Sequence, residues 1–111
     1  MSTRNHPVLW TEVATRDPER LAAYLAEETP LRAKAIIDRI VARADSLAQT
    51  PNRGRVPPEI RSLGDPTWRE LLEPPWRILY RVAGESRVEI HGVLDGRRDL
   101  EDILLERLLR P

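Results

Sequence analysis

The chain has 111 residues, and its 18 basic and 18 acidic side chains cancel to a formal net charge of zero. This length fits a single domain over residues 1–111, and a protein that depends mainly on phosphate contacts is usually basic, so simple nucleic-acid coating is disfavoured. The absence of cysteine excludes disulfides and thiolate catalysis. Because there is no signal-peptide pattern and no apolar run near the roughly 20 residues of a membrane span, we expect a cytoplasmic protein with no membrane partner.

The N-terminal half predicts one strand and two helices. A short strand is expected at Val8–Val13. Asp17-Pro18 is typical of an N-cap followed by proline at the first helical position, and Thr29-Pro30 repeats the signal. The second helix should run to about Gln49, because its apolar residues recur at helical spacing. Two helices joined so tightly are expected to form an antiparallel hairpin.

The C-terminal half predicts a proline-rich loop over residues 50–58, then three strands and a helix. The strands are expected at Trp68–Leu72, Trp76–Val82 and Arg87–Leu94, and the helix near Asp99. Helices that are separate in sequence from a run of antiparallel strands indicate an α+β fold.

Arginines cluster on the last two predicted strands. Strand alternation places Arg77 and Arg81 on one face, and Arg97 and Arg98 follow the final strand. Four guanidinium groups on a small sheet suggest an anionic ligand. The alternative is a solvated face on which surface ion pairs contribute at most about 1 kcal/mol each. The carboxylates available for such pairs are Glu70, Glu73, Glu89 and Asp95.

Other catalytic constellations are missing from the sequence. His6 and His91 are the only histidines, no Gly-rich phosphate loop occurs, and no ligand spacing indicates a metal, so we predict neither a metal nor a cofactor. His91 has the residue type of a general acid or base, but a sheet-surface histidine paired with Glu89 or an arginine is favoured.

The predicted last helix is unusually rich in large aliphatic residues. One small sheet covers only a narrow helical stripe, so some of these residues should form an interface, unless the helix packs wholly on the strands and on the second helix. The residues concerned include Leu100, Ile103, Leu104 and Leu108.

Three segments together resemble the RelE/ParE family of bacterial toxins from type II toxin–antitoxin systems. Residues 51–59 are similar to the family's P-x-x-G-R-x-x-P-E loop. Residues 68–71 and 76–82 are similar to its R-E-L and Y-R-I-x-Y-x-V strands, and residues 93–100 to its closing V-x-H-G-R-R-D-L segment. The resemblance implies two helices packed on a small twisted antiparallel sheet, followed by a C-terminal helix.

The resemblance also implies a cognate antitoxin as partner, with operator DNA contacted only indirectly through that antitoxin. ParE-like members block DNA gyrase, whereas RelE-like members cleave mRNA on the ribosome. A third possibility is a non-toxic member that only binds its antitoxin. The chain is therefore an enzyme only if it is RelE-like.

In RelE-like members, residues matching Arg69, Arg77 and Arg98 would hold the scissile phosphate and stabilise its charge. Leu71 stands where those members commonly carry a second basic residue, and residues 100–111 lack a tyrosine or histidine. These departures favour the ParE-like side. Partner binding is then expected at Arg81, Arg97, Arg98, Leu100, Ile103, Leu104 and Leu108.

Overall fold

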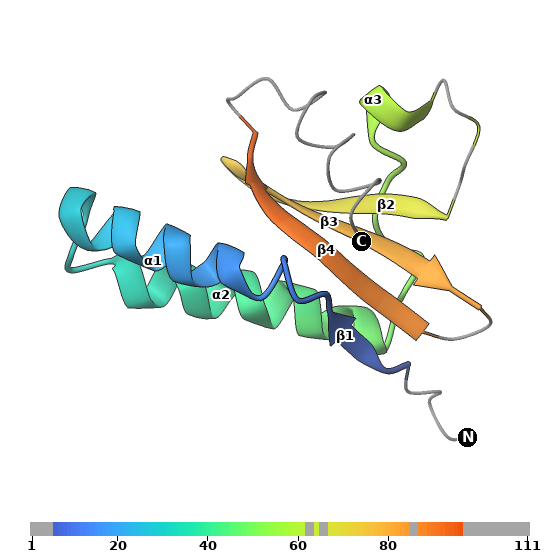
Figure 1. The fold of residues 1–111 in the computed structure, drawn as a ribbon, viewed down its shortest axis with the longest axis horizontal. Helices are drawn as coiled ribbons and strands as arrows, with labels where there is room; N and C mark the ends of the chain where they lie inside the picture. Colours follow the sequence, from blue (N-terminus) through green and yellow to red (C-terminus); the bar gives the residue numbers. More distant parts are fainter. Residues whose placement is uncertain (1–5, 62–63, 65–66, 85–86, 97–111) are drawn as a thin grey trace.

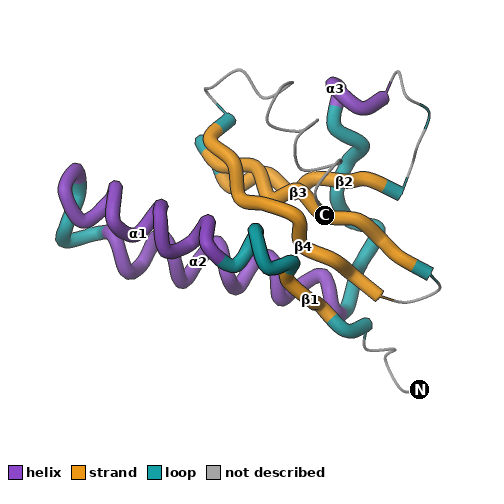
Figure 2. The backbone as a smooth tube through the Cα atoms, in the orientation of Figure 1, coloured by secondary structure: helices purple, strands orange, loops and turns teal. Residues whose placement is uncertain are grey.

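The computed structural model describes residues 6–61, 64, 67–84 and 87–96, and it confirms the α+β fold (Figures 1 and 2). In chain order the elements are β1 (Val8–Trp10), α1 (Arg16–Glu28), α2 (Ala33–Asp45), a 3-10 helix (Ser46–Ala48), α3 (Pro58–Arg61), β2 (Trp68–Glu73), β3 (Trp76–Ala83) and β4 (Arg87–Asp95). The helix predicted from Asp99 lies outside the described residues. Figure 1 shows the α1–α2 hairpin along one face of the sheet and α3 on the other side.

The strands form one sheet in the order β1-β4-β3-β2. The three C-terminal strands pair antiparallel, as predicted, but β1 joins the edge of β4 in parallel. The predicted extension of β1 to Val13 is wrong. The Thr11 side-chain oxygen accepts the Ala14 N–H at 3.1 Å, which turns the chain from the strand into α1.

The helix starts also differ from the prediction. Asp17 lies inside the first turn of α1, and Thr15 occupies the N-cap position. Residues 29–32 form the turn of the hairpin, so α2 begins at Ala33, and its last predicted turn is the 3-10 helix. Proline can occupy either a turn or a helix start with the same φ, so the Thr-Pro pattern alone did not distinguish them.

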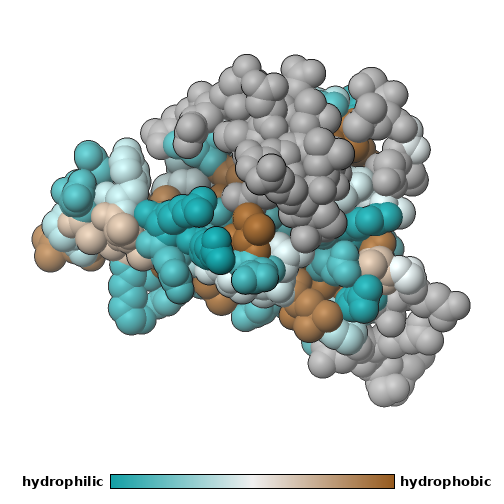
Figure 3. Space-filling view, in the orientation of Figure 1, coloured by the Kyte–Doolittle hydropathy of each residue, from teal (hydrophilic) through white to brown (hydrophobic). Residues whose placement is uncertain are grey.

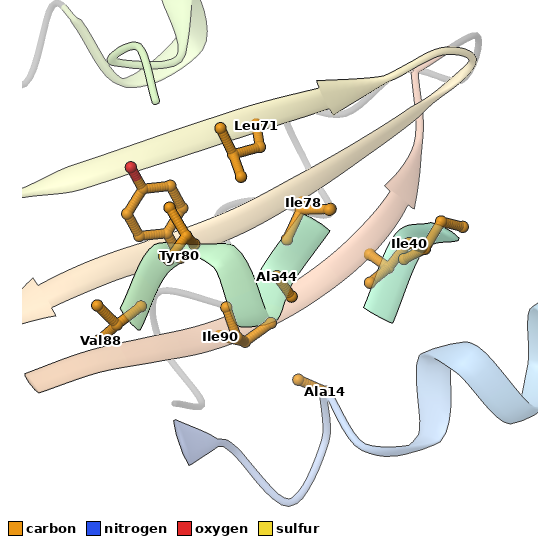
Figure 4. Close-up of a cluster of buried hydrophobic side chains, with 10 residues drawn as sticks. Ala14, Ile40, Ala44, Leu71, Ile78, Tyr80, Val88 and Ile90 are labelled. Carbon is orange, nitrogen blue, oxygen red and sulfur yellow. The ribbon is translucent and has the colours of Figure 1, made fainter. Parts of the chain in front are cut away.

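The main core lies between the sheet and the helical hairpin (Figure 4). Ile40 and Ala44 of α2 and Leu47 of the following 3-10 helix are buried, and their spacing of four and three residues places them toward the same side. They pack with alternate residues of the strands, including Ile78 and Tyr80 of β3. Each fully buried large aliphatic side chain of this kind stabilises the fold by about 1.5–3 kcal/mol.

A β-bulge in β4 couples the sheet to the first helix. Leu79 pairs with Gly92 but Tyr80 pairs with Ile90, which leaves His91 as the extra residue. Just beyond the bulge, the Val93 N–H donates to the buried carboxylate of Asp17 at 3.0 Å. The first turn of α1 therefore supplies an acceptor for a buried backbone donor of β4.

We expect Asp17→Ala to lower the free energy of unfolding by about 2 kcal/mol, because a buried N–H that loses its acceptor costs about 1–3 kcal/mol. Urea denaturation at neutral pH measures this change. Glu19→Ala is the matched control, since Glu19 also lies in the first turn but is exposed. Equal losses in the two variants would show that the helix dipole, and not the Asp17–Val93 hydrogen bond, carries the effect.

The exposed surface of the helices is largely hydrophilic, with separate apolar patches (Figure 3). Among the residues that the structure describes, the most exposed large apolar side chain is Leu31 at the turn of the hairpin, and Leu9 of β1 is half-exposed. Within the described ranges, no helix is long and apolar enough to cross a membrane.

Candidate functional site

The sheet face opposite α1 and α2, here called the outer face, carries most of the charged side chains of the strands. Antiparallel register places Arg77 and Arg81 of β3 on this face together with Trp68 and Glu70 of β2. The predicted common orientation of the two arginines is therefore confirmed. Their surroundings differ, however, and the difference decides what each arginine can bind.

Arg77 is held by two carboxylates of the same chain. Its two terminal nitrogens donate to the two oxygens of Glu59 on α3 at 2.7 and 2.8 Å, and its Nε donates to Glu70. The side chain is 13% exposed, and that of Glu70 is 2% exposed. A bidentate pair uses the planar fork of the guanidinium fully, so little of Arg77 remains to receive an external phosphate.

The pKa values of Arg77 and Glu59 reflect the contact between them. Hydrogen bonds from Arg77 lower the pKa of Glu59 below its ordinary value, against the opposing effect of burial. The bond to Glu59 in turn raises the pKa of Arg77, with a further contribution from Glu70. Arg77 and Glu59 are therefore both charged at neutral pH.

The loop before α3 is fastened to β2 and β3 by its glycine and arginine. Gly54 donates its N–H to the hydroxyl of Tyr80 at 2.8 Å, and a Cβ here would lie 2.5 Å from the Glu70 carbonyl oxygen. Arg55 pairs its backbone with Glu70 in an isolated bridge, and its Nε donates to the Glu70 carboxylate at 2.7 Å. Residues 51–59, the P-x-x-G-R-x-x-P-E segment, thus form a clasp in which Gly54, Arg55 and Glu59 each hold the sheet.

Arg69 lies on the other face of the sheet from Arg77. Its register partner is Tyr80, which is fully buried in the core beneath the helices. Its Nη1 donates to the Gly54 carbonyl oxygen at 2.8 Å. The two described members of the predicted set Arg69, Arg77 and Arg98 are therefore not brought together.

Arg81 and His91 both contact Trp68 on the outer face. The Arg81 guanidinium is exposed and sits 5.5 Å from the centre of the Trp68 ring. His91, predicted as a sheet-surface residue, is instead buried, because the bulge turns it edge-on to Trp68 at 4.6 Å between ring centres. Its Nε2 lies 3.4 Å from Glu89, which confirms that part of the prediction.

A hollow of about 290 Å³ lies beside β1 and the start of β4. Its lining residues are Leu9, Trp10, Thr11, Arg87, Glu89 and His91. Across the part of the chain that the structure describes, no group of three or more His, Asp or Glu side chains could hold a metal ion. The remaining predicted residues, Arg97, Arg98, Leu100, Ile103, Leu104 and Leu108, lie outside the described residues.

Comparison with known protein families decides the identity of this fold. A family model described as the ParE toxin of the type II toxin–antitoxin system parDE matches residues 8–100. The chain belongs to this family of toxins. The match includes the clasp and all four strands, so the segments that carried the resemblance are the ones that build the sheet and fasten its loop.

Relatives of this ParE-family toxin carry both names of the wider RelE/ParE group. This chain is 39% identical over 77 residues to toxin RelE2 of Caulobacter vibrioides. The aligned segment covers 68% of this chain and 80% of that protein. The toxin–antitoxin complex RelBE2 of Mycobacterium tuberculosis matches with a TM-score of 0.60 at 25% identity, over 85% of this chain and 94% of the matched chain. The chromosomal ParDE system of P. aeruginosa has the same fold, with a TM-score of 0.67 at 24% identity over 83% and 97% of the two chains.

The lowered pKa of Glu59 predicts an acid-sensitive contribution to stability. A carboxyl whose folded pKa lies below its ordinary value stabilises the fold above that value, and this contribution is lost as the pH falls through the folded pKa. We therefore expect wild type to be more stable than Glu59→Gln at pH 7 and the difference to shrink between about pH 5 and pH 3. Urea denaturation of both proteins across this range measures it.

Glu27→Gln is the matched control for this pH dependence, because Glu27 is exposed on α1 and forms no ion pair with any described residue. The free energy of unfolding of Glu27→Gln should equal that of wild type at every pH. A constant difference between wild type and Glu59→Gln from pH 7 to about pH 3 would contradict the assignment.

Proposed function

We propose that this ParE-family toxin arrests growth by binding and inhibiting DNA gyrase, and that a cognate antitoxin neutralises it. The observation that carries the proposal is the internal pairing of Arg77. An arginine whose fork is taken by Glu59 and Glu70 is poorly placed to stabilise the charge of a cleaving phosphate. Arg69, which faces away from it, is poorly placed to help.

A binding mode of inhibition requires surfaces and no reacting groups. The exposed Arg81 on Trp68 and the hollow beside β1 give the outer face features that a protein partner can contact. The antitoxin partner is supported by the matched structures, since one is by name a toxin–antitoxin complex and the other a ParDE toxin–antitoxin system. We expect that antitoxin to contact Arg81 and the predicted residues beyond Gly96.

Ribosome-dependent mRNA cleavage is the second candidate, and the 39% identical relative named toxin RelE2 favours it. In that case Arg77 would have to leave its two carboxylates when RNA binds. Removal of Glu59 would then raise cleavage, because it would free one side of the guanidinium.

Controlled induction in a bacterial host distinguishes these functions. We expect growth to stop on induction, reporter plasmids to lose negative supercoiling, and co-expression of the neighbouring antitoxin gene to restore both. Growth arrest with intact supercoiling and with codon-specific mRNA ends would instead establish the RelE-like function. Normal growth at a verified level of folded protein would contradict toxicity and leave the non-toxic, antitoxin-binding member.

A further inference from the structure

A line of arginines follows the contact between α2 and the edge strand β2. Arg39 and Arg43 lie one turn apart on α2, Arg53 lies in the clasp, and Arg69 lies on β2. We call them the seam arginines. They are separate from Arg77 and Arg81, which lie on the outer face.

The two arginines of α2 share one carboxylate. Glu73, at the end of β2, lies 3.5 Å from Arg39 Nε and 3.5 Å from Arg43 Nε. Arg43 also donates its Nη2 to the Leu72 carbonyl oxygen at 3.1 Å. Two positive charges therefore face a single negative charge at this end of the seam.

The other two arginines are anchored without a carboxylate. Arg53 donates its Nη2 to the Ser46 hydroxyl at 2.7 Å, and Arg69 donates its Nη1 to the Gly54 carbonyl oxygen at 2.8 Å. No carboxylate of the described residues lies within ion-pair distance of either guanidinium. Both positive charges act on the buried hydroxyl of Tyr80, opposing the rise in its pKa that burial causes.

This anchoring differs from that of three other described arginines, two on the strands and one in the clasp. Arg55, Arg77 and Arg87 are each paired with a glutamate. The anchored guanidiniums of Arg53 and Arg69 keep unused N–H donors and an uncompensated charge. Their orientation is fixed by neutral partners, so less side-chain freedom is lost when a ligand binds.

The seam is long enough for several contacts. Arg69 and Glu73 are four residues apart on β2, which corresponds to about 13 Å. From Arg39 on α2 to Ser46 at the start of the 3-10 helix is about 10 Å. An ion pair joins Glu73 to Arg43, and hydrogen bonds join Ser46 to the Arg43 carbonyl oxygen and to Arg53. Arg69 binds the carbonyl oxygen of Gly54, the residue that follows Arg53, so these groups lie one after another along the seam.

We propose that the seam arginines form a binding surface for an acidic, extended segment of a partner protein, whose carboxylates are bound by the unused guanidinium donors. The surface does not depend on which target the toxin inhibits. A carboxylate fits an arginine fork in a bidentate manner, and opposite charge favours a segment rich in aspartate or glutamate.

Two observations define how that segment binds. The edge of β2 is closed to an added strand, because Arg55 pairs with the backbone of Glu70 and Arg43 occupies the Leu72 carbonyl oxygen. The partner segment must therefore be bound by side chains and not as an additional strand of the sheet. A protein segment is favoured over nucleic acid because the whole chain is neutral, with 18 basic and 18 acidic residues.

The test measures binding of a fluorescent probe to the full-length toxin. The probe is a labelled peptide of about eight residues in which glutamate alternates with serine, which spans the seam when extended. We expect saturable binding that weakens as KCl is raised, and about tenfold weaker binding to the double variant Arg39→Gln, Arg53→Gln. These two side chains are exposed, and Glu73 keeps Arg43 as its partner, so the variant should fold.

The double variant Arg20→Gln, Arg32→Gln is the matched control. It removes the same charge from exposed arginines of the helical hairpin that have no ion-pair partner among the described residues. Its affinity for the peptide should equal that of wild type, and both variants should melt at the wild-type temperature. Equal weakening in the two variants, no binding at low salt, or tighter binding of a single-stranded oligonucleotide of matched charge would each overturn the proposal.

Discussion

Arg77→Ala is expected to lower the free energy of unfolding by about 3 kcal/mol, because it removes one partner of a buried ion pair and leaves Glu70 short of a donor. Glu59 would lose both of its hydrogen bonds to Arg77, and α3 would lose its charged attachment to the sheet. Arg55 would still hold Glu70 from the solvent side, which keeps the loss at the low end of the range for buried pairs. Urea denaturation followed by tryptophan fluorescence measures the change.

Arg81→Ala is the control for that experiment, since Arg81 lies on the same strand and the same face but is exposed over Trp68. It should cost about 1 kcal/mol or less. If the two variants lose the same stability, the ion pairs of Arg77 with Glu59 and Glu70 do not hold the fold as the geometry indicates. Arg77 would then be free for the phosphate-binding role that the RelE-like alternative gives it.

Gly54→Ala is expected to destabilise the protein by about 3 kcal/mol, at the upper end of the cost of overpacking. The new methyl group would lie 2.5 Å from the Glu70 carbonyl oxygen and 2.7 Å from the Tyr80 hydroxyl. Neither atom can retreat easily, because one belongs to the backbone of β2 and the other to a fully buried ring. Thermal unfolding followed by circular dichroism measures the effect, and the clasp should be more sensitive to proteolysis.

Gly84→Ala separates this steric effect from the general cost of replacing a glycine. Gly84 has a φ of +61° with open space around its Cα, so its substitution should cost about 1 kcal/mol from backbone strain alone. Gly54 does not have a positive φ, so its replacement by alanine adds no backbone strain of this kind. A Gly54→Ala protein as stable as wild type would show that the clasp is looser than the described contacts require.

The strand pattern predicted the sheet well, because alternation and turn residues are local signals. The pattern placed Arg77 and Arg81 on a common face of the sheet, and the register of β3 confirms this prediction. It could not reveal Glu59 as the partner of Arg77, since the two residues are 18 positions apart and meet only when the clasp closes. It also assumed unbroken alternation in β4, and the bulge at His91 moved that side chain into a buried contact with Trp68.

The functional interpretation of the arginines depended on register. The resemblance to RelE-like toxins grouped Arg69 with Arg77, but the pairing of Arg69 with Tyr80 places it on the helix side of the sheet. A shift of one residue in a strand exchanges its faces, so this grouping could not be tested before the register was known. The segment containing Gly54, Arg55 and Glu59 was visible as a motif, yet its role as a clasp follows only from the three contacts it makes with the sheet.

The most direct measurement for the proposed mode of action is DNA supercoiling by purified gyrase in the presence of the purified toxin. Inhibition by binding predicts that supercoiling falls as the ratio of toxin to gyrase rises and that it recovers when the antitoxin is added. The same toxin should leave mRNA intact in a translation extract. Undiminished supercoiling at high molar excess of folded toxin, together with ribosome-dependent mRNA cleavage, would contradict the proposal and return Arg77 to a catalytic role.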